Sequence, residues 1–124
     1  MATIKSYTDL QQSKKLAEIL PIESADMFLA MNGTLPVMSK YIDDGFVTAD
    51  ETAIPCWSLA SLLELLPKRL KIMDNVYELS VYLYGLYYWS ITNGNLCFES
   101  KDKGNLVDAC YEAIVFLHEQ KLSL

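Results

Sequence analysis

Residues 77–99 read YELSVYLYGLYYWSITNGNLCFE, and this stretch decides the fold. Polar and apolar residues alternate along it, a pattern typical of half-buried β-strands. Asn93-Gly94 is a strong signal for a two-residue hairpin loop, because a type I′ turn needs positive φ at both central positions. Such a loop pairs Trp89 with Phe98, and a second turn surrounds Gly85. The stretch therefore predicts a three-stranded antiparallel meander.

The register of the first hairpin follows from which residues it would bury. A two-residue loop (Tyr84-Gly85) and a three-residue loop (Tyr84 to Leu86) send the same side chains to opposite faces, because a one-residue slip exchanges the faces. The three-residue loop places Val81 opposite Trp89 and makes one face almost entirely apolar. We therefore expect an inner face of Tyr77, Leu79, Val81, Leu83, Tyr87, Trp89, Ile91, Leu96 and Phe98. The expected outer face consists of Glu78, Ser80, Tyr82, Tyr88, Ser90, Thr92, Cys97 and Glu99.

A helix after the meander is expected to cover this inner face. Asn105 is suited to cap a helix from Leu106 to about Lys121, because its side chain can accept a hydrogen bond from the first turn. Apolar residues recur at helical spacing along one side, at Leu106, Val107, Cys110, Tyr111, Ile114 and Leu117. Phe116 lies on the polar side, either as a singly exposed aromatic residue or as an oligomer contact.

Two shorter helices are expected before the meander. Ser58 is placed to cap a helix that Pro67 ends. Thr8, with Gln11 three residues later, has the spacing of a capping box and is expected to open a helix closed by Pro21. Both segments carry leucines at helical spacing, which gives each helix an apolar side.

The segment from Ile22 to Pro55 is the least regular part of the sequence. A turn is expected at Asn32-Gly33, a short strand from Val37 to Ile42, and a loop from Asp43 to Thr52. Together the elements predict an α+β fold, in which an antiparallel β-meander of three or more strands packs against helices. A length of 124 residues is typical of one domain, so we expect residues 1–124 to form a single globular domain.

Composition and charge narrow the function classes. Hydrophobic residues make up 52% and charged residues 21% of the chain, which favours a folded protein. No signal-peptide core or membrane-length apolar run is present, and three cysteines without a CxxC pair favour a reducing compartment, so we expect a cytoplasmic protein with no membrane partner. The net charge is −6 and the only basic clusters are Lys14-Lys15 and Lys68 to Lys71, so no nucleic-acid partner is expected.

Residues with catalytic potential are few. His118 is the only histidine, so one chain cannot form a two-histidine metal site. Cys56 precedes a predicted helix start, a setting that can lower a thiol pKa, although packing is the commoner role of a cysteine. No nucleotide-binding glycine motif or nucleophile elbow is present. We therefore expect no enzyme, no catalytic residue, no metal and no cofactor. A cysteine-dependent enzyme stays an alternative that requires His118 or a carboxylate beside Cys56.

Three blocks of sequence carry a resemblance to a known group of proteins. They are QSKKLAEILPIESADM (Gln12 to Met27), IPCWSLASLLELLP (Ile54 to Pro67) and NLVDACYEAIVFLHEQKL (Asn105 to Leu122). Together they cover somewhat under half of the chain, and they resemble small proteins encoded in bacterial prophages and conjugative elements. The resemblance implies a short cytosolic accessory protein of a mobile genetic element. It brings no activity and no catalytic residues.

These observations favour a non-enzymatic module that binds another protein. Tyrosine among small hydroxyl residues gives adaptable contact area, so Tyr82, Tyr84 and Tyr88 are candidate contacts, together with Phe116. A solvated antiparallel face also commonly carries tyrosine and threonine, which is the competing explanation. A homodimer is a second possibility, formed by the sheet edge at Asn95 to Glu99.

A small-ligand-binding protein is the alternative function. This hypothesis places a pocket between the helices and the irregular segment from Ile22 to Pro55. It requires a closed cavity with convergent polar groups, among them Asp26 and Cys56.

Overall fold

The computed structural model describes residues 5–29, 36–38, 54–101 and 104–122. Its elements, in chain order, are α1 (Leu10–Ile19), a short 3₁₀ helix (Ile22–Ser24), β1 (Met27–Leu29), β2 (Pro36–Met38), β3 (Ile54–Cys56), α3 (Leu59–Leu65), β4 (Arg69–Ile72), β5 (Asn75–Tyr82), β6 (Gly85–Ser90), β7 (Leu96–Glu99) and α4 (Leu106–Glu119). The predicted α+β fold, with an antiparallel meander packed against helices, is confirmed.

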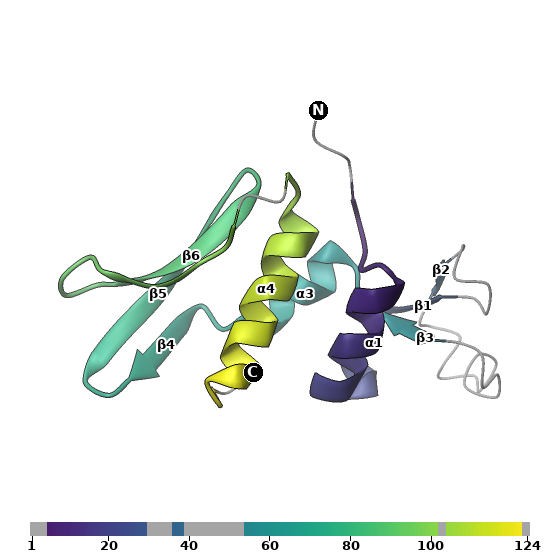
Figure 1. Cartoon of the computed structure of the whole chain (residues 1–124), viewed down its shortest axis with the longest axis horizontal. Helices are drawn as coiled ribbons and strands as arrows, with labels where there is room; N and C mark the ends of the chain where they lie inside the picture. The colour runs from purple at the N-terminus through teal and green to yellow at the C-terminus, as the bar shows by residue number, and fades with distance from the viewer. Residues whose placement is uncertain (1–4, 30–35, 39–53, 102–103, 123–124) are drawn as a thin grey trace.

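The helices form the middle of the molecule and separate two sheets (Figure 1). On one side lies a four-stranded sheet of order β4-β5-β6-β7, and on the other a three-stranded sheet of order β2-β1-β3. Helix α4 contacts β6 and β7, while α3 and α1 both contact α4, and α1 also contacts β3. The larger sheet is therefore covered on one face and joined to the rest of the molecule mainly through α4.

The caps of α4 and α3 are those that the sequence predicts. The Asn105 side chain accepts a hydrogen bond from the Asp108 N–H at 2.8 Å, and the Ser58 side chain accepts one from the Ser61 N–H. These caps satisfy N–H groups that the first turn of a helix leaves without partners. The residues that α4 buries are small or aliphatic: Val107, Ala109, Cys110, Ala113, Ile114 and Leu117.

The predicted cap of α1 is wrong by one residue. Asp9 caps the helix and forms a reciprocal capping box with Gln12. Thr8 is fully buried, where its hydroxyl pairs with that of Ser13 and accepts a hydrogen bond from the Trp57 N–H. The Thr8 side chain joins the start of α1 to the end of β3 and is therefore not available as a cap.

The irregular segment contributes the smaller sheet. Strand β1 pairs antiparallel with both β2 and β3, so residues that the sequence left without a clear period form a three-stranded unit. The predicted strand from Val37 to Ile42 agrees with β2 at residues 37 and 38. The rest of that strand, the Asn32-Gly33 turn and the loop from Asp43 to Thr52 lie outside the described residues.

The order of the meander is confirmed, but its predicted register is wrong. The loop between β5 and β6 is Leu83-Tyr84, so Tyr82 pairs with Gly85 and Leu79 pairs with Tyr88. The shift relative to the predicted pairing is an odd number of residues, and the two faces of β6 are therefore exchanged. Tyr88 is fully buried, as are Leu86 and Ser90, whereas Tyr87 and Trp89 point to the other face and are half-buried.

Gly85 explains part of the difference. It is the first residue of β6 and lies opposite the aromatic ring of Tyr82. A Cβ at this glycine would lie 2.5 Å from the Tyr82 Oη and 2.8 Å from the Ser100 Oγ. Gly85 is thus a strand residue over which a tyrosine ring packs, and its role as a turn residue in the sequence-based prediction is wrong.

The second hairpin also departs from the prediction. Gly94 has a φ of 79°, but Asn93 has no positive φ, so the turn is not of type I′. The loop is wider, and the Ser90 Oγ accepts hydrogen bonds from two N–H groups within it, those of Thr92 and Asn93. A register shift between Tyr88 and Trp89 pairs Trp89 with Leu96, so the predicted pair of Trp89 with Phe98 is wrong.

Candidate interaction surface

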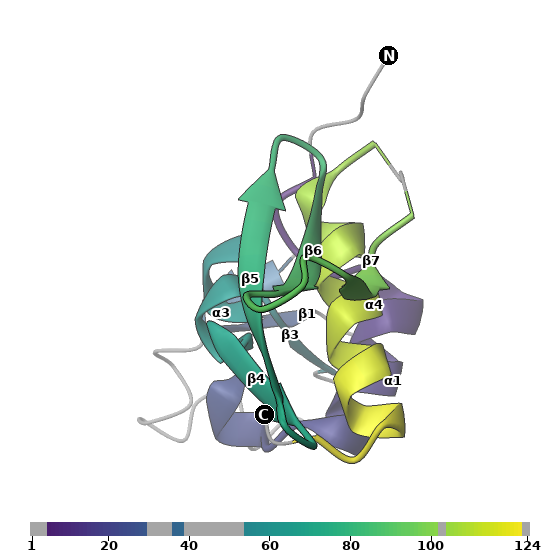
Figure 2. The ribbon, with the colours of Figure 1, turned by 90° about the vertical axis from the view of Figure 1, so that its left-hand side faces the viewer.

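The outer face of the larger sheet follows from this register. Directly opposed residues share a face, and the pairs of Trp89 with Glu78 and with Leu96 fall on the side away from α4. Ile91 continues the pattern, because its N–H donates to the Val76 carbonyl oxygen at 3.1 Å. The outer face thus consists of Arg69, Lys71, Val76, Glu78, Ser80, Tyr82, Tyr87, Trp89, Ile91, Leu96 and Glu99. Figure 2 shows the sheet in front of the helices, with no other described element drawn over it.

Aromatic side chains occupy the middle of the outer face. The rings of Tyr82 and Tyr87 are tilted against each other with centroids 6.2 Å apart. The Trp89 indole Nε1 donates a hydrogen bond to the Ser80 Oγ at 2.9 Å, which fixes the orientation of the ring. Large side chains that are held in place lose little entropy when a partner covers them, so this arrangement is suited to binding.

Apolar residues are also exposed at both ends of the sheet. Leu83, in the β5–β6 loop, is 75% exposed, and Met73, in the β4–β5 turn, is 88% exposed. Ile91 and Leu96, in and beside the β6–β7 loop, are 47% and 48% exposed. Scattered apolar residues are normal on a protein surface, but Ile91 and Leu96 lie beside Trp89 on the outer face and extend its apolar area.

Met73 has an unusual backbone conformation. Its φ is 56°, a left-handed value that side chains with a Cβ rarely adopt and that normally favours glycine. Met73 lies in the tight turn between β4 and β5, because the residues on either side of the turn, Ile72 and Asn75, pair with each other. A residue in a strained conformation with a fully accessible apolar side chain is a candidate for a functional contact.

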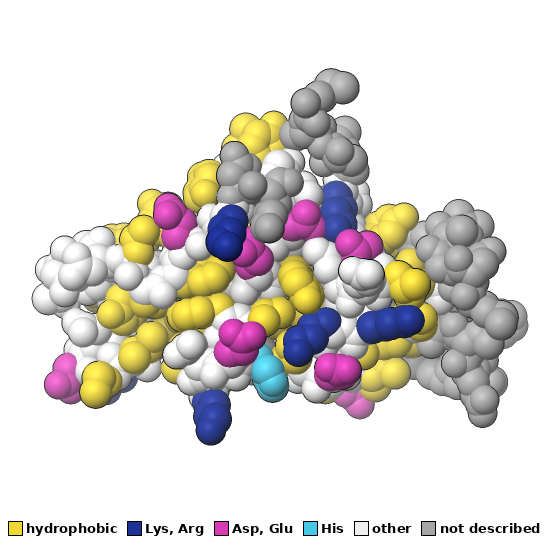
Figure 3. All heavy atoms as spheres, in the orientation of Figure 1, with side chains coloured by type: hydrophobic (Ala, Val, Ile, Leu, Met, Phe, Trp, Pro, Cys, Tyr) yellow, Lys and Arg dark blue, Asp and Glu magenta, His cyan; other side chains and the backbone are white. Residues whose placement is uncertain are grey.

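The charges of the outer face are balanced. Arg69 and Lys71 lie on the edge strand β4, Glu78 lies on β5, and Glu99 lies on the opposite edge strand β7. On the side of the molecule shown in Figure 3, basic and acidic side chains are likewise interspersed among hydrophobic ones. Among the described residues on the side drawn in Figure 3, no concentrated basic area of the kind that binds a phosphate backbone is seen.

One predicted contact residue does not belong to this surface. Tyr88 is fully buried, and its hydroxyl donates a hydrogen bond to the Pro67 carbonyl oxygen at 2.7 Å. Burial raises the pKa of the Tyr88 hydroxyl far above its usual value, so the group stays protonated. The prediction that Tyr88 faces outward is wrong, because the exchanged register turns it into the core.

The other predicted contact residues reach the surface to different degrees. Tyr82 and Tyr84 are 47% and 41% exposed, in agreement with their predicted positions on and beside the outer face. Phe116 is half-buried in α4 and packs against Phe98 with ring centroids 4.8 Å apart. Phe116 therefore helps attach α4 to β7 on the covered side of the sheet.

The described cysteines are not activated. Burial and the charge of Asp26 raise the pKa of the Cys56 thiol to about 11, although a hydrogen bond with Thr8 acts in the opposite direction. The Asp26 carboxylate itself is engaged by the N–H and the hydroxyl of Ser58. Asp26 and Cys56 thus serve internal contacts. His118 is exposed in the last turn of α4, and burial also raises the pKa values of Cys97 and Cys110.

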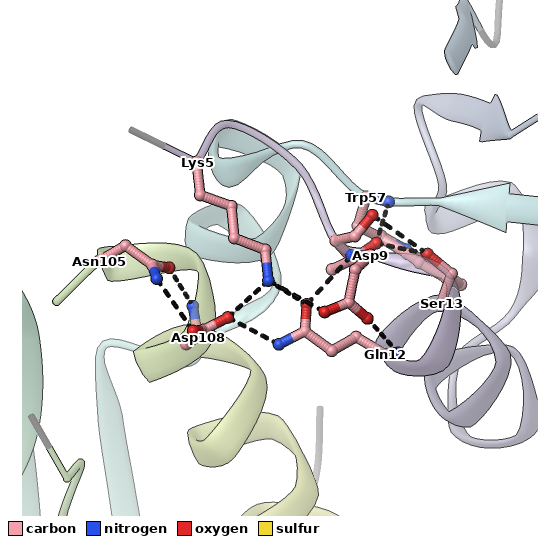
Figure 4. A network of polar contacts seen from close by, with 8 residues as sticks. Lys5, Asp9, Gln12, Ser13, Trp57, Asn105 and Asp108 are labelled. Atoms are coloured by element: carbon pink, nitrogen blue, oxygen red, sulfur yellow. Dashed lines mark hydrogen bonds and ion pairs between the residues drawn. The ribbon is translucent and has the colours of Figure 1, made fainter. Parts of the chain in front are cut away.

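A polar cluster joins α1 to α4 on the other side of the molecule (Figure 4). The Lys5 ammonium donates hydrogen bonds to Asp9, to the Gln12 side chain at 2.9 Å and to Asp108 at 2.7 Å. Asp108 also accepts hydrogen bonds from Gln12 and Asn105. Burial works to raise the pKa of the Asp108 carboxyl, but these hydrogen bonds outweigh it and hold the pKa below its usual value.

This cluster borders an open pocket of about 240 Å³, lined by Lys5, Ser6, Tyr7 and Asp9. The ammonium group is the only cationic side chain of that lining and is already bound by three acceptors. A ligand would have to displace these contacts, so the arrangement is suited to holding the helices together rather than to recognition.

The sequence analysis missed six residues of the candidate surface: Leu83, Tyr87, Trp89, Ile91, Leu96 and Met73. It placed the first five on the inner face, which is wrong, and assigned no role to Met73. The alternation of Arg69-Leu70-Lys71-Ile72 before a turn is a signal that predicts the additional strand β4. No comparable signal distinguishes Tyr87 from Tyr88.

Among the described residues, no group of histidine, cysteine, aspartate or glutamate side chains is arranged to hold a metal ion. Within the same ranges, none of the helices has the length and apolar character needed to cross a bilayer. No family model matches the chain, and neither a curated protein nor a solved structure is significantly similar to it.

Proposed function

We propose that this chain is a non-enzymatic interaction module that binds a protein through the outer face of its larger sheet. The observation that carries the proposal is the aromatic patch of Tyr82, Tyr87 and Trp89, continued by exposed Ile91 and Leu96. Interfaces are enriched in tyrosine and tryptophan at their centres, and their rims carry charged residues. Arg69 and Glu99 occupy such rim positions on the two edge strands.

The resemblance to proteins of prophages and conjugative elements supports a cellular context for this proposal. In that context the module is a cytoplasmic accessory protein of a mobile genetic element. The raised pKa values of the buried thiols support a binding role over a cysteine-dependent reaction, because a protonated thiol is a poor nucleophile.

Site-specific crosslinking in cells tests the proposal. A photoreactive phenylalanine analogue at Tyr87 is expected to crosslink to a polypeptide after irradiation. The same analogue at Lys15, an exposed position on α1, provides a matched control and is expected to give little product. Equal crosslinking from both positions, or none from Tyr87, would contradict an interaction through the outer face.

A further inference from the structure

We infer that the partner is a second copy of this chain, stacked outer face against outer face around a two-fold axis that runs parallel to the strands. The inference rests on the proposed function, since it names the occupant of the same surface. In a two-fold interface the same patch contributes from both copies, so the patch must complement itself. The outer face meets this condition in its charges and in its apolar ends.

The charges complement each other under this axis. A two-fold axis in the interface and parallel to the strands reverses the strand order, so β4 of one copy lies over β7 of the other. Arg69 on β4 then lies across from Leu96 of β7, and Glu99, in the next outer-face row of β7, is its diagonal neighbour within reach of the long arginine side chain. An in-plane axis perpendicular to the strands would instead place β4 over β4 and bring like charges together, which is unfavourable.

The exposed apolar ends complement each other in the same arrangement. The β4–β5 turn and the β6–β7 loop lie at the same end of the sheet, because neighbouring strands are antiparallel. The axis therefore places Met73 of one copy over Ile91 and the adjoining loop of the other. This contact gives a role to a methionine that is 88% exposed and has a φ of 56°. The β5–β6 loop, with exposed Leu83, meets its own equivalent.

The size of the sheet sets the expected strength. With strands about 4.8 Å apart and a rise of about 3.3 Å per residue, strands of four, eight, six and four residues give the sheet a flat area of roughly 350 Å². Stable interfaces bury about 800 Å² per partner. The outer face is well below this size, so we expect a weak dimer that dissociates on dilution, with a Kd at the upper end of the micromolar range.

Charge exchange combined with sedimentation velocity provides the decisive experiment. The unmodified chain is expected to shift from monomer to dimer as its concentration rises. Arg69→Glu and Glu99→Lys are each expected to weaken the dimer by about ten-fold or more, because each places like charges across both symmetric contacts. An equimolar mixture of the two variants is expected to recover the dimer, since both contacts then join opposite charges. Lys15→Glu, on exposed α1, is the matched control and should leave the dimer unchanged.

The variant Met73→Gly distinguishes an effect on the dimer contact of Met73 from an effect on the stability of the fold. Glycine adopts positive φ without strain, so this variant is expected to raise the melting temperature and, at the same time, to weaken the dimer. A variant that only damaged the fold would lower both quantities. A Met73→Gly dimer as strong as that of the unmodified chain would overturn the contact between Met73 and the loop of the second copy.

The outcomes distinguish this inference from the proposed function. A chain that stays monomeric at all concentrations, while Tyr87 still crosslinks to a different polypeptide, overturns the second copy and leaves the proposed function in place. If neither Arg69→Glu nor Glu99→Lys weakens the dimer, the two copies contact each other elsewhere, for example along the β7 edge. This result also overturns the inference. If the chain stays monomeric and the probe at Tyr87 crosslinks to no polypeptide, both proposals are overturned.

Discussion

Tyr87 and Tyr88 are neighbours in β6 and occupy opposite environments. Tyr88 is fully buried on the face that α4 covers, with its hydroxyl bound to the Pro67 carbonyl oxygen. Tyr87 is half-buried on the outer face beside the ring of Tyr82. In a sheet covered on one face, pairing register decides which of two identical residues supports the fold and which remains available for binding.

Replacing each tyrosine in turn is expected to give the largest difference. Tyr88→Ala removes a buried ring and leaves a cavity, so a loss of about 3–5 kcal/mol in the free energy of unfolding is expected. Tyr87→Ala removes a half-exposed ring, and a loss of less than about 1 kcal/mol is expected. Urea unfolding followed by circular dichroism measures both values. Similar losses for the two variants would contradict the assigned faces.

Gly85→Ala tests the contact that sets the register. The added Cβ would lie 2.5 Å from the Tyr82 Oη and 2.8 Å from the Ser100 Oγ, so a loss of about 1–3 kcal/mol is expected. Part of this loss should disappear when the substitution is made together with Tyr82→Ala, because the ring is then absent while the contact with Ser100 remains. Equal costs in the presence and absence of Tyr82 would show that the ring does not pack over the glycine. Chemical unfolding of the three variants completes this double-mutant cycle.

The layer that covers the inner face should be sensitive to acid. The pKa of Asp108 in the folded protein lies below its ordinary value of 3.8, so its stabilising contribution is complete above that value. The contribution is lost as the pH falls through the lower folded-state pKa. Asp108→Asn is expected to cost about 1 kcal/mol at neutral pH and to make stability less dependent on pH in the acidic range. Thermal unfolding between neutral and strongly acidic pH checks this, and an unchanged pH dependence would contradict it.

The smallest expected effect lies at the end of the outer face. Met73→Gly relieves a positive φ and should raise the free energy of unfolding by about 0.5–1 kcal/mol, as measured by urea unfolding. Met73→Ala keeps the strain and removes the exposed side chain, so it should leave stability nearly unchanged. If Met73→Gly instead destabilises the protein, the methionine side chain supports the fold. The difference between the covered face and the outer face would then be smaller at the β4–β5 turn.

Much of the fold was predictable because its signals are local. The caps at Ser58 and Asn105, the buried side of α4 and the existence of the meander all follow from residues close together in the sequence. Strands β1, β2 and β3 were not predictable as a sheet, because each has only three residues and so shows no period.

The candidate site was predictable only in part, because register depends on distant contacts. Tyr82 and Tyr84 are exposed as expected, but the observed register buries Tyr88, whose hydroxyl then bonds the carbonyl oxygen of Pro67, 21 residues away in the chain. Tyrosine suits either face of a sheet, and the apolar appearance of Trp89 favoured the wrong one. Relative to the prediction, the shift in strand register places Trp89 on the outer face and Tyr88 in the core.

The bond between Lys5 and Asp108 has a consequence for the order of folding during synthesis. The two residues lie 103 positions apart, and a chain grows by about 5–20 residues per second. Asp108 is therefore synthesised roughly 5–20 s after Lys5. Helix α1 can meet β3 during that interval, but its attachment to α4 must be the last to form. A truncation before Asp108 is therefore expected to leave the Lys5 ammonium with Asp9 and Gln12 as its partners and to make α1, which has lost its attachment to α4, more accessible to proteases.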